Sequence, residues 1–240
     1  MKLGDFGIDR LYTGDCRVLM KRLPQASVDL AICDPPFGIA FSGRPSNYNR
    51  TKERVIVGYN EVSGDYKRFT LSWLLPLCRV LKPTASVYIF SSWNNLRDVL
   101  NALVETDLHI LNHLIWKYQF GVYTRRRWVT SHYHIIFAVK DPKDYTFNKV
   151  ADYMEDVLIV KREYWTGKEK TPTKLPLQLV ETLLLVSSNP EDIVLDPFMG
   201  SGTTAVAAKK HGRHFIGFEI VSDYVKLAQK RLKAVQRALL

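Results

Sequence analysis

The feature that most constrains this 240-residue chain is an apolar segment that ends in a rigid acidic turn. The run Val28 to Cys33 is followed directly by Asp34-Pro35-Pro36-Phe37. The run predicts a buried strand of an open α/β sheet, and such sheets hold their ligands at the carboxyl ends of their strands. Proline has no backbone N–H, so we expect the carbonyl oxygens of this turn to lack ladder partners and to accept hydrogen bonds from a ligand.

Strand and helix patterns alternate along the whole chain, which is typical of an α/β fold with a mostly parallel sheet. Residues 141–173 show no clean period, and we expect a small insertion there within a single domain, 1–240. The expected strands cover residues 10–16, 28–33, 85–90, 109–116, 133–139, 193–195 and 214–218, and the expected helices 18–23, 66–80, 94–106, 176–186, 203–211 and the stretch after 219.

Composition limits the class of protein. The three cysteines have neither CxxC spacing nor an even count, and no window reaches the roughly 18 apolar residues of a membrane span. We therefore expect a reduced, cytoplasmic protein. The formal net charge of +10 favours polyanionic partners, although ordinary solubility is an alternative reading of the same charge.

Two polar segments mix cations with aromatic residues, a combination that can grip phosphates and stack bases. Residues 38–64 follow the acidic turn and could close over a substrate as a lid. Residues 117–130 precede an apolar strand, and the alternative there is a solvated hairpin. The candidate nucleic-acid-binding residues are Arg44, Arg50, Lys52, Arg54, Lys117, Tyr123, Arg125, Arg126, Arg127 and Trp128.

A glycine-rich turn lies near the other end of the chain. Gly200-Ser201-Gly202-Thr203-Thr204 follows an expected strand and opens an expected helix, and Glu219 ends the next strand. This is the arrangement of a nucleotide site, because the glycines let the backbone approach a ligand and the acid can accept hydrogen bonds from a ribose. Alone, the pattern would equally suit NAD, and a tight turn that needs small residues is the weaker alternative.

Together, the two turns carry a family resemblance. Asp34-Pro35-Pro36-Phe37 and the segment 196–204 (Asp-Pro-Phe-Met-Gly-Ser-Gly-Thr-Thr) resemble the amino DNA methyltransferases that use S-adenosylmethionine, and the order of the turns is that of the β-class, circularly permuted members. The resemblance runs from Gly14 to Glu219. It implies a doubly wound, mostly parallel, seven-stranded Rossmann-like sheet, with a catalytic half (about 1–140), a target-recognition insertion (about 141–173) and a cofactor half (about 174–240).

The resemblance also implies roles for individual residues. Asp34 and the Pro35 carbonyl would hold the target amine while Phe37 stacks on the flipped base, with Pro36 completing the turn. The segment 171–176 departs from the family pattern His-Pro-Thr-x-Lys-Pro at Thr171 and Leu175. The implied cofactor-binding residues are Asp15, Cys16, Asp34, Thr171, Lys174, Asp196, Phe198, Gly200, Ser201, Gly202, Thr203, Thr204 and Glu219. Asp15 could instead be a helix cap.

No metal is expected, because the histidines lack the partners of a zinc site. The implied reaction is methyl transfer from S-adenosylmethionine to adenine N6 in duplex DNA. Cytosine-N4 methylation is the alternative, followed by RNA methylation. From other classes, an NAD-dependent oxidoreductase would leave the acidic turn unexplained, and a non-catalytic DNA-binding protein would not bind the cofactor. A homodimer and a cognate restriction endonuclease are possible partners.

Overall fold

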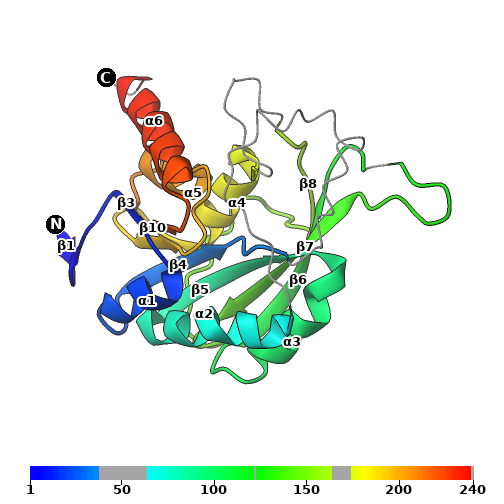
Figure 1. Cartoon of the computed structure of the whole chain (residues 1–240), viewed down its shortest axis with the longest axis horizontal. Helices are drawn as coiled ribbons and strands as arrows, with labels where there is room; N and C mark the ends of the chain where they lie inside the picture. The colour runs from blue at the N-terminus through cyan, green and yellow to red at the C-terminus, as the bar shows by residue number, and fades with distance from the viewer. Residues whose placement is uncertain (38–63, 122, 164–173, 239–240) are drawn as a thin grey trace.

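The computed structural model describes residues 1–37, 64–121, 123–163 and 174–238 (Figure 1). The strands of its main sheet are β3 (Arg10–Thr13), β4 (Val28–Cys33), β5 (Leu81–Ser91), β6 (His109–Lys117), β7 (His132–Val139), β8 (Val157–Ile159), β9 (Ile193–Asp196) and β10 (His214–Glu219). The helices are α1 (Cys16–Leu19), α2 (Tyr66–Val80), α3 (Leu96–Leu103), α4 (Leu177–Ser187), α5 (Thr203–Lys210) and α6 (Ser222–Ala238), with 3-10 turns η1 (Met20–Arg22) and η4 (Trp93–Asn95). A short hairpin, β1 (Lys2–Leu3) and β2 (Phe6–Gly7), precedes them.

The main sheet has the order β3-β10-β9-β4-β5-β7-β6-β8. Neighbouring strands are parallel except where β7 pairs antiparallel with β5 and β6. The prediction of a doubly wound, mostly parallel sheet is confirmed. The described sheet has eight strands where seven were expected, because β8 lies in the segment 141–173 and pairs with the outer edge of β6.

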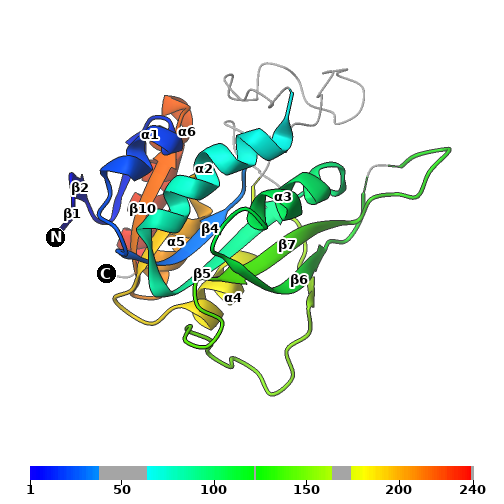
Figure 2. The ribbon, with the colours of Figure 1, turned by 90° about the horizontal axis from the view of Figure 1, so that it is seen from below.

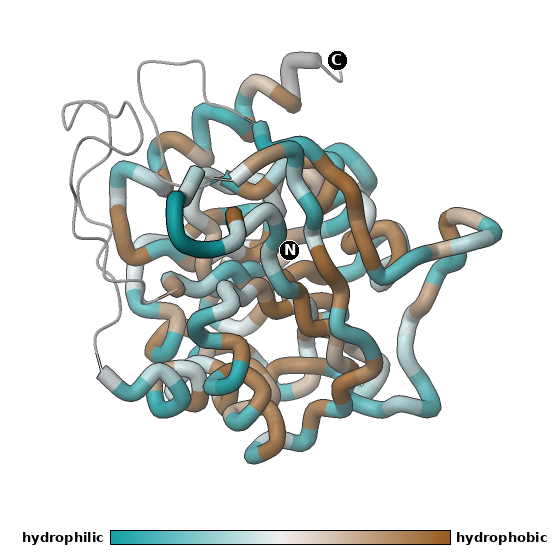
Figure 3. The backbone as a smooth tube through the Cα atoms, turned by 90° about the vertical axis from the view of Figure 1, so that its right-hand side faces the viewer, coloured by the Kyte–Doolittle hydropathy of each residue, from teal (hydrophilic) through white to brown (hydrophobic). Residues whose placement is uncertain are grey.

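Helices cover both faces of the sheet, which explains why Leu30 to Cys33 of its central strand β4 are all apolar and buried rather than alternately apolar and polar. In β4, Ala31 and Cys33 face the layer of α1, α2 and α3, whereas Leu30 and Ile32 face the layer of α4, α5 and α6. Figures 1 and 2 show these layers on opposite sides of the sheet, and in Figure 3 the hydrophobic segments gather in the middle of the molecule.

Strand order reverses between β4 and β9. From β4 the chain moves outward through β5, and from β9 it moves the other way through β10. Leu30 and Ala31 pair with Val194 and Leu195 across this junction. A crevice outside the carboxyl ends of two such strands is the usual ligand site of an open α/β sheet. In this fold, the acidic turn after β4 and the glycine turn after β9 meet at that position.

Candidate active site

The acidic turn leaves the sheet at its carboxyl edge. Cys33, the last residue of β4, is buried, and Asp34 and Phe37 are only partly exposed. The Asp34 carboxylate makes no hydrogen bond or ion pair with any described residue. Burial, and secondarily the charge of Asp196, raises the pKa of Asp34 to about 7. A carboxylate held in this way, without a protein partner, is a ready hydrogen-bond acceptor for a ligand.

The two proline carbonyls of the turn differ. The Tyr66 hydroxyl, from the first turn of α2, donates a hydrogen bond of 2.9 Å to the Pro36 carbonyl. The expectation that both carbonyls are free is therefore wrong for Pro36, because a helix far along the chain supplies a donor. The Pro35 carbonyl accepts no hydrogen bond within the described part of the chain, so it and the Asp34 carboxylate are the acceptors left at the turn.

The glycine turn after β9 is built around the Asp196 carboxylate. Asp196 accepts hydrogen bonds from the Phe198 N–H (2.9 Å) and the Thr204 hydroxyl (2.6 Å), which tie the turn to the start of α5. Asp196 is 4% exposed, and burial raises its pKa to about 7 against the opposing effect of these bonds. The Phe198 ring packs edge-on against Trp73 of α2, with ring centroids 5.2 Å apart.

Glycine is required in this turn for two different reasons. Gly200 has φ +50°, a left-handed conformation, and a Cβ there would meet only a carbonyl oxygen at 3.8 Å, so the space beside it is open. Gly202 has φ +82°, and its Cβ would lie 2.6 Å from the Cβ of Ala228 in α6. Gly200 therefore leaves room next to the backbone, whereas Gly202 lets two helices approach closely.

Glu219 ends β10 and joins the turn to the next segment. One carboxylate oxygen accepts from the Gly200 N–H (2.8 Å) and the other from the Val221 N–H (2.9 Å). Burial raises the pKa of Glu219 despite these bonds. Each oxygen has a second lone pair, so the carboxylate can still accept hydrogen bonds from a ligand.

Asp15 and Cys16 lie at the carboxyl end of β3, on the other side of β10 from the glycine turn. Asp15 caps α1 by accepting from the Arg17 N–H and also forms an ion pair with the Arg17 guanidinium. The alternative that Asp15 caps a helix is thus confirmed, and the cap holds residues 15 and 16 at the same edge of the sheet. Burial, followed by the charge of Asp15, raises the pKa of the Cys16 thiol to about 12.

The segment before α4 contributes an ionic cluster. Lys174 pairs with Glu163, and the Glu163 carboxylate also accepts from the Leu177 N–H (2.7 Å). Arg231 of α6 donates to the Ser201 carbonyl (2.5 Å) and to the Ser201 and Thr203 hydroxyls. Sequence reasoning missed Glu163 and Arg231, because neither belongs to a motif. Thr171 lies outside the described residues.

The predicted nucleic-acid-binding residues fall into two groups. Arg44, Arg50, Lys52 and Arg54 lie outside the described residues. The others belong to the segment 117–131, and Figures 1 and 2 show that the part between β6 and β7 projects away from the sheet. On this arm, Trp128 is 96% exposed and Tyr123 79% exposed, and residues 125–127 are exposed arginines. Tyr123 and Trp128 do not fold back on the sheet, which argues against the alternative of a solvated hairpin whose aromatic residues pack on it. Tyr118, at the base of the arm, does pack on the sheet and is 3% exposed.

An aromatic cluster supports the acidic turn. Phe37 lies against Tyr133 of β7, with ring centroids 5.2 Å apart, and Tyr133 contacts Trp116 and Tyr118 at 5.7 and 5.6 Å. The guanidinium of Arg162 lies 3.7 Å from the Tyr118 ring centroid. Sequence reasoning missed Arg162 because it lies in the segment 141–173, where no period is visible.

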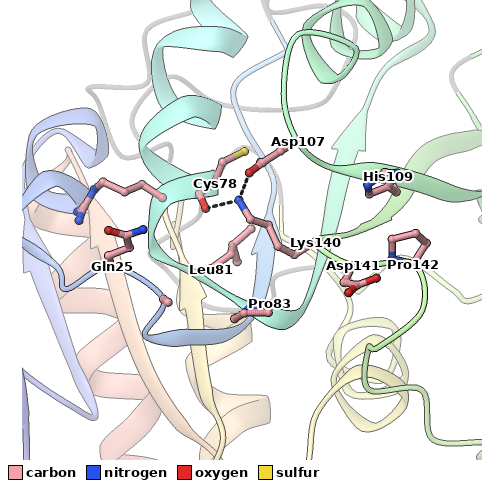
Figure 4. Close-up of a pocket in the computed structure, with 11 residues that line it drawn as sticks. Gln25, Cys78, Leu81, Pro83, Asp107, His109, Lys140, Asp141 and Pro142 are labelled. Atoms are coloured by element: carbon pink, nitrogen blue, oxygen red, sulfur yellow. Dashed lines mark hydrogen bonds and ion pairs between the residues drawn. The ribbon is translucent and has the colours of Figure 1, made fainter.

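Figure 4 shows an open pocket at the opposite, amino edge of the sheet, where Lys140 donates to the Cys78 carbonyl at 2.9 Å and pairs with Asp107. This pocket includes none of the predicted site residues. Among the described residues, no group of three or more His, Cys, Asp or Glu side chains is placed to hold a metal ion. No helix in the described ranges is long and apolar enough to cross a membrane.

Comparisons with known proteins identify the family of this chain. Residues 28–230 match the family described as DNA methylase, of the N6/N4 methyltransferase group. The chain is 30% identical to the type II methyltransferase M.HinfI of Haemophilus influenzae, over 98% of this chain and 70% of that protein. It is 31% identical to the type II methyltransferase M2.DpnII of Streptococcus pneumoniae, over 93% of this chain and 89% of that protein.

Among solved structures, the complex of M1.HpyAVI with S-adenosylmethionine has a TM-score of 0.70 to this chain. The sequences are 27% identical, and the match covers 93% of this chain and 98% of that one. The predicted cofactor, S-adenosylmethionine, and the resemblance from which it was inferred are confirmed. With the acidic turn and the glycine turn side by side at the strand-order reversal, the chain belongs to the DNA methylase family of S-adenosylmethionine-dependent amino methyltransferases.

Proposed function

We propose that this protein transfers a methyl group from S-adenosylmethionine to the exocyclic N6 of an adenine flipped out of duplex DNA. The observation that carries the proposal is the unpartnered Asp34 carboxylate beside the glycine turn, at the strand-order reversal. An exocyclic amine is a poor nucleophile, because its lone pair is delocalised into the ring. The site must therefore localise that lone pair, and two adjacent acceptors can do so.

The Asp34 carboxylate and the Pro35 carbonyl are those acceptors. The two amine hydrogens would donate to them, which draws the nitrogen toward tetrahedral geometry and directs its lone pair out of the base plane. Asp34 also stabilises the positive charge that develops on the amine, and Phe37 stacks on the flipped base. When bound, S-adenosylmethionine supplies a methyl group activated by its sulfonium. The Tyr66 hydroxyl holds the turn rigid through the Pro36 carbonyl.

The residues around the glycine turn fit the cofactor. The open space beside Gly200 and the free lone pairs of Glu219 suit a ligand with an extended backbone and a ribose. In the proposal, Asp196, Phe198, Gly200 and Gly202 hold the methionine end, Glu219 holds the ribose hydroxyls, and Asp15 and Cys16 border the adenine. The further cofactor-binding residues of the proposal are Ser201, Thr203, Thr204, Thr171 and Lys174.

Duplex DNA is the proposed partner, and the net charge of +10 supports it. On the arm, Arg125, Arg126 and Arg127 would contact phosphates, while Tyr123 and Trp128 offer exposed rings for stacking. Lys117 lies at the base of the arm. The proposal includes Arg44, Arg50, Lys52 and Arg54 as further DNA contacts and a cytoplasmic location. It also includes a homodimer and a cognate restriction endonuclease in the cell as partners.

The test is transfer of labelled methyl from S-adenosylmethionine to duplex DNA, followed by nucleoside analysis. We expect the label in N6-methyladenine. Asp34→Ala should reduce the rate by at least about 100-fold while cofactor binding is largely retained. Asp34→Asn is the matched variant, because it keeps the shape of the side chain but exchanges one acceptor for a donor. Label in N4-methylcytosine, or none in DNA, would sink the proposal.

A further inference from the structure

Arg162 is held rigidly in the aromatic cluster beside the acidic turn. Its guanidinium lies 3.7 Å from the ring centroid of Tyr118 and 5.3 Å from that of Tyr133. Its backbone is fixed as well, because the Arg162 N–H donates to the Gln119 side chain at 2.7 Å and the Gln119 amide reaches back to the Arg162 carbonyl at 3.4 Å. The side chain is therefore positioned before any ligand arrives.

The guanidinium of Arg162 lacks the acceptors that other arginines of this chain have. Arg79 and Arg213 donate to backbone carbonyls, and Arg231 donates to the glycine turn. The Arg162 guanidinium makes no hydrogen bond or ion pair with any described residue, and its buried Nε has no partner. A buried donor without an acceptor is unfavourable, so this arrangement points to an acceptor supplied by a ligand.

The position of Arg162 identifies the ligand. The ring of Tyr133 is a shared neighbour, because its centroid lies 5.2 Å from that of Phe37 and 5.3 Å from the Arg162 guanidinium. If a base stacks on Phe37, we expect the sugar and phosphates of the same nucleotide to lie near the Arg162 side chain. A guanidinium stacked on a ring keeps its hydrogen-bonding edge free, and this planar edge matches the oxygens of a phosphate.

We propose that Arg162 binds a backbone phosphate of the flipped nucleotide or of its immediate neighbour. This inference rests on the proposed function and adds a residue that holds the DNA strand from which the base is flipped. Stacking on Tyr118 fixes the orientation of the planar Arg162 guanidinium, so less conformational entropy is lost when the phosphate binds. Arg162 thus joins the insertion to the aromatic support of Phe37, so that binding of the strand and placement of the base are coupled.

The test uses duplexes in which one phosphate near the target adenine is replaced by a neutral methylphosphonate, one position at a time. The target sequence is first found by locating methylated bases in DNA treated with wild-type enzyme. Wild-type affinity should fall by about tenfold for one modified position, and Arg162→Gln should lose affinity for unmodified DNA to a similar extent without responding to that position. Arg162→Lys should keep part of the affinity for DNA, because lysine retains the positive charge but lacks the planar guanidinium that can donate two hydrogen bonds to one phosphate.

Arg22→Gln is the matched control. Arg22 also lies over an aromatic ring, 5.1 Å from the Phe6 centroid, but at the amino edge of the sheet and paired with Asp5 at 3.0 Å. This variant should bind DNA like the wild type. Arg162→Gln should also lower the slope of log affinity against log salt by about 1, with S-adenosylmethionine affinity unchanged.

Three results would overturn the inference. In the first, Arg162→Gln binds unmodified DNA like the wild type. In the second, it responds to every methylphosphonate as the wild type does. In the third, its loss is confined to duplexes with one particular base pair, which would identify a base contact instead. If wild-type enzyme binds S-adenosylmethionine but methylates no DNA, the proposed function fails first, and that outcome is recorded before any Arg162 variant is compared.

Discussion

Replacing Asp196 by Asn should stabilise the cofactor-free protein at alkaline pH. Burial raises the pKa of Asp196 from 3.8 to about 7, so the folded protein holds a proton that the unfolded chain has already lost. The stability contributed by this group is therefore fully present below about pH 4 and is lost as the pH rises through about 7. Asn preserves the hydrogen bonds, because its oxygen can accept from the Phe198 N–H and its amide can donate to the Thr204 hydroxyl.

The size of the effect follows from the two pKa values. The difference between 3.8 and about 7 corresponds to about 4 kcal/mol of unfolding free energy, which is an upper limit. Of the interval between the two pKa values, about 2 pH units lie above pH 5. The advantage of Asp196→Asn in unfolding free energy should therefore be up to about 3 kcal/mol larger at pH 8.5 than at pH 5. For a domain of this size that equals roughly 6 to 12 °C in Tm.

Urea denaturation at pH 5, 7 and 8.5 measures this difference without cofactor. Asp223→Asn controls for the loss of one negative charge, because Asp223 is an exposed carboxylate of α6 that pairs with Lys226. Its stability relative to wild type should change little with pH. An Asp196→Asn advantage that is the same at pH 5 and pH 8.5 would refute the reasoning. In the proposed function the same variant binds S-adenosylmethionine more weakly, so stability and cofactor affinity should change in opposite directions.

Two further predictions concern the turns. Tyr66→Phe removes the donor to the Pro36 carbonyl and should lower the unfolding free energy by about 0.5–1.5 kcal/mol, measured by urea denaturation, with a smaller loss of methyl transfer than Asp34→Ala. Unchanged stability would contradict this role. Gly202→Ala should destabilise the protein by more than Gly212→Ala, because both glycines have positive φ but only Gly202 would also place its Cβ against Ala228. Equal losses in thermal unfolding would show that backbone strain alone matters.

The sequence predicted the secondary structure well where the elements are long and buried. The expected strand 133–139 and helix 66–80 match β7 and α2 closely. The strand expected at 85–90 begins earlier, at Leu81, because Leu81 pairs with Val28 across an irregularity in β4. β8 could not be predicted, since three residues show no period and the strand exists only because β6 offers it an open edge.

The site was predictable to the extent that it lies in local motifs. The acidic turn and the glycine turn each follow a strand, Glu219 is the last residue of another strand, and parallel strands bring their carboxyl ends to one edge. The Tyr66 hydrogen bond and the Arg162 stack were not predictable in this way. Each joins residues about 30 or more positions apart, and nothing local in the sequence indicates which donor reaches which acceptor.

The position of β9 has a consequence for how the chain folds during synthesis. β9 lies between β4 and β10, and β3 pairs only with β10 in the sheet. The strands β3 and β4, which are synthesised early, therefore pair with strands that are synthesised last. Until residues 193–219 leave the ribosome, β4 has one unpaired edge and β3 has no partner in the sheet. Such long-range pairing slows folding and exposes edges that can aggregate. The acidic turn and the glycine turn should therefore come together only when synthesis is nearly complete. Nascent chains that end before β9 should need chaperones to stay soluble.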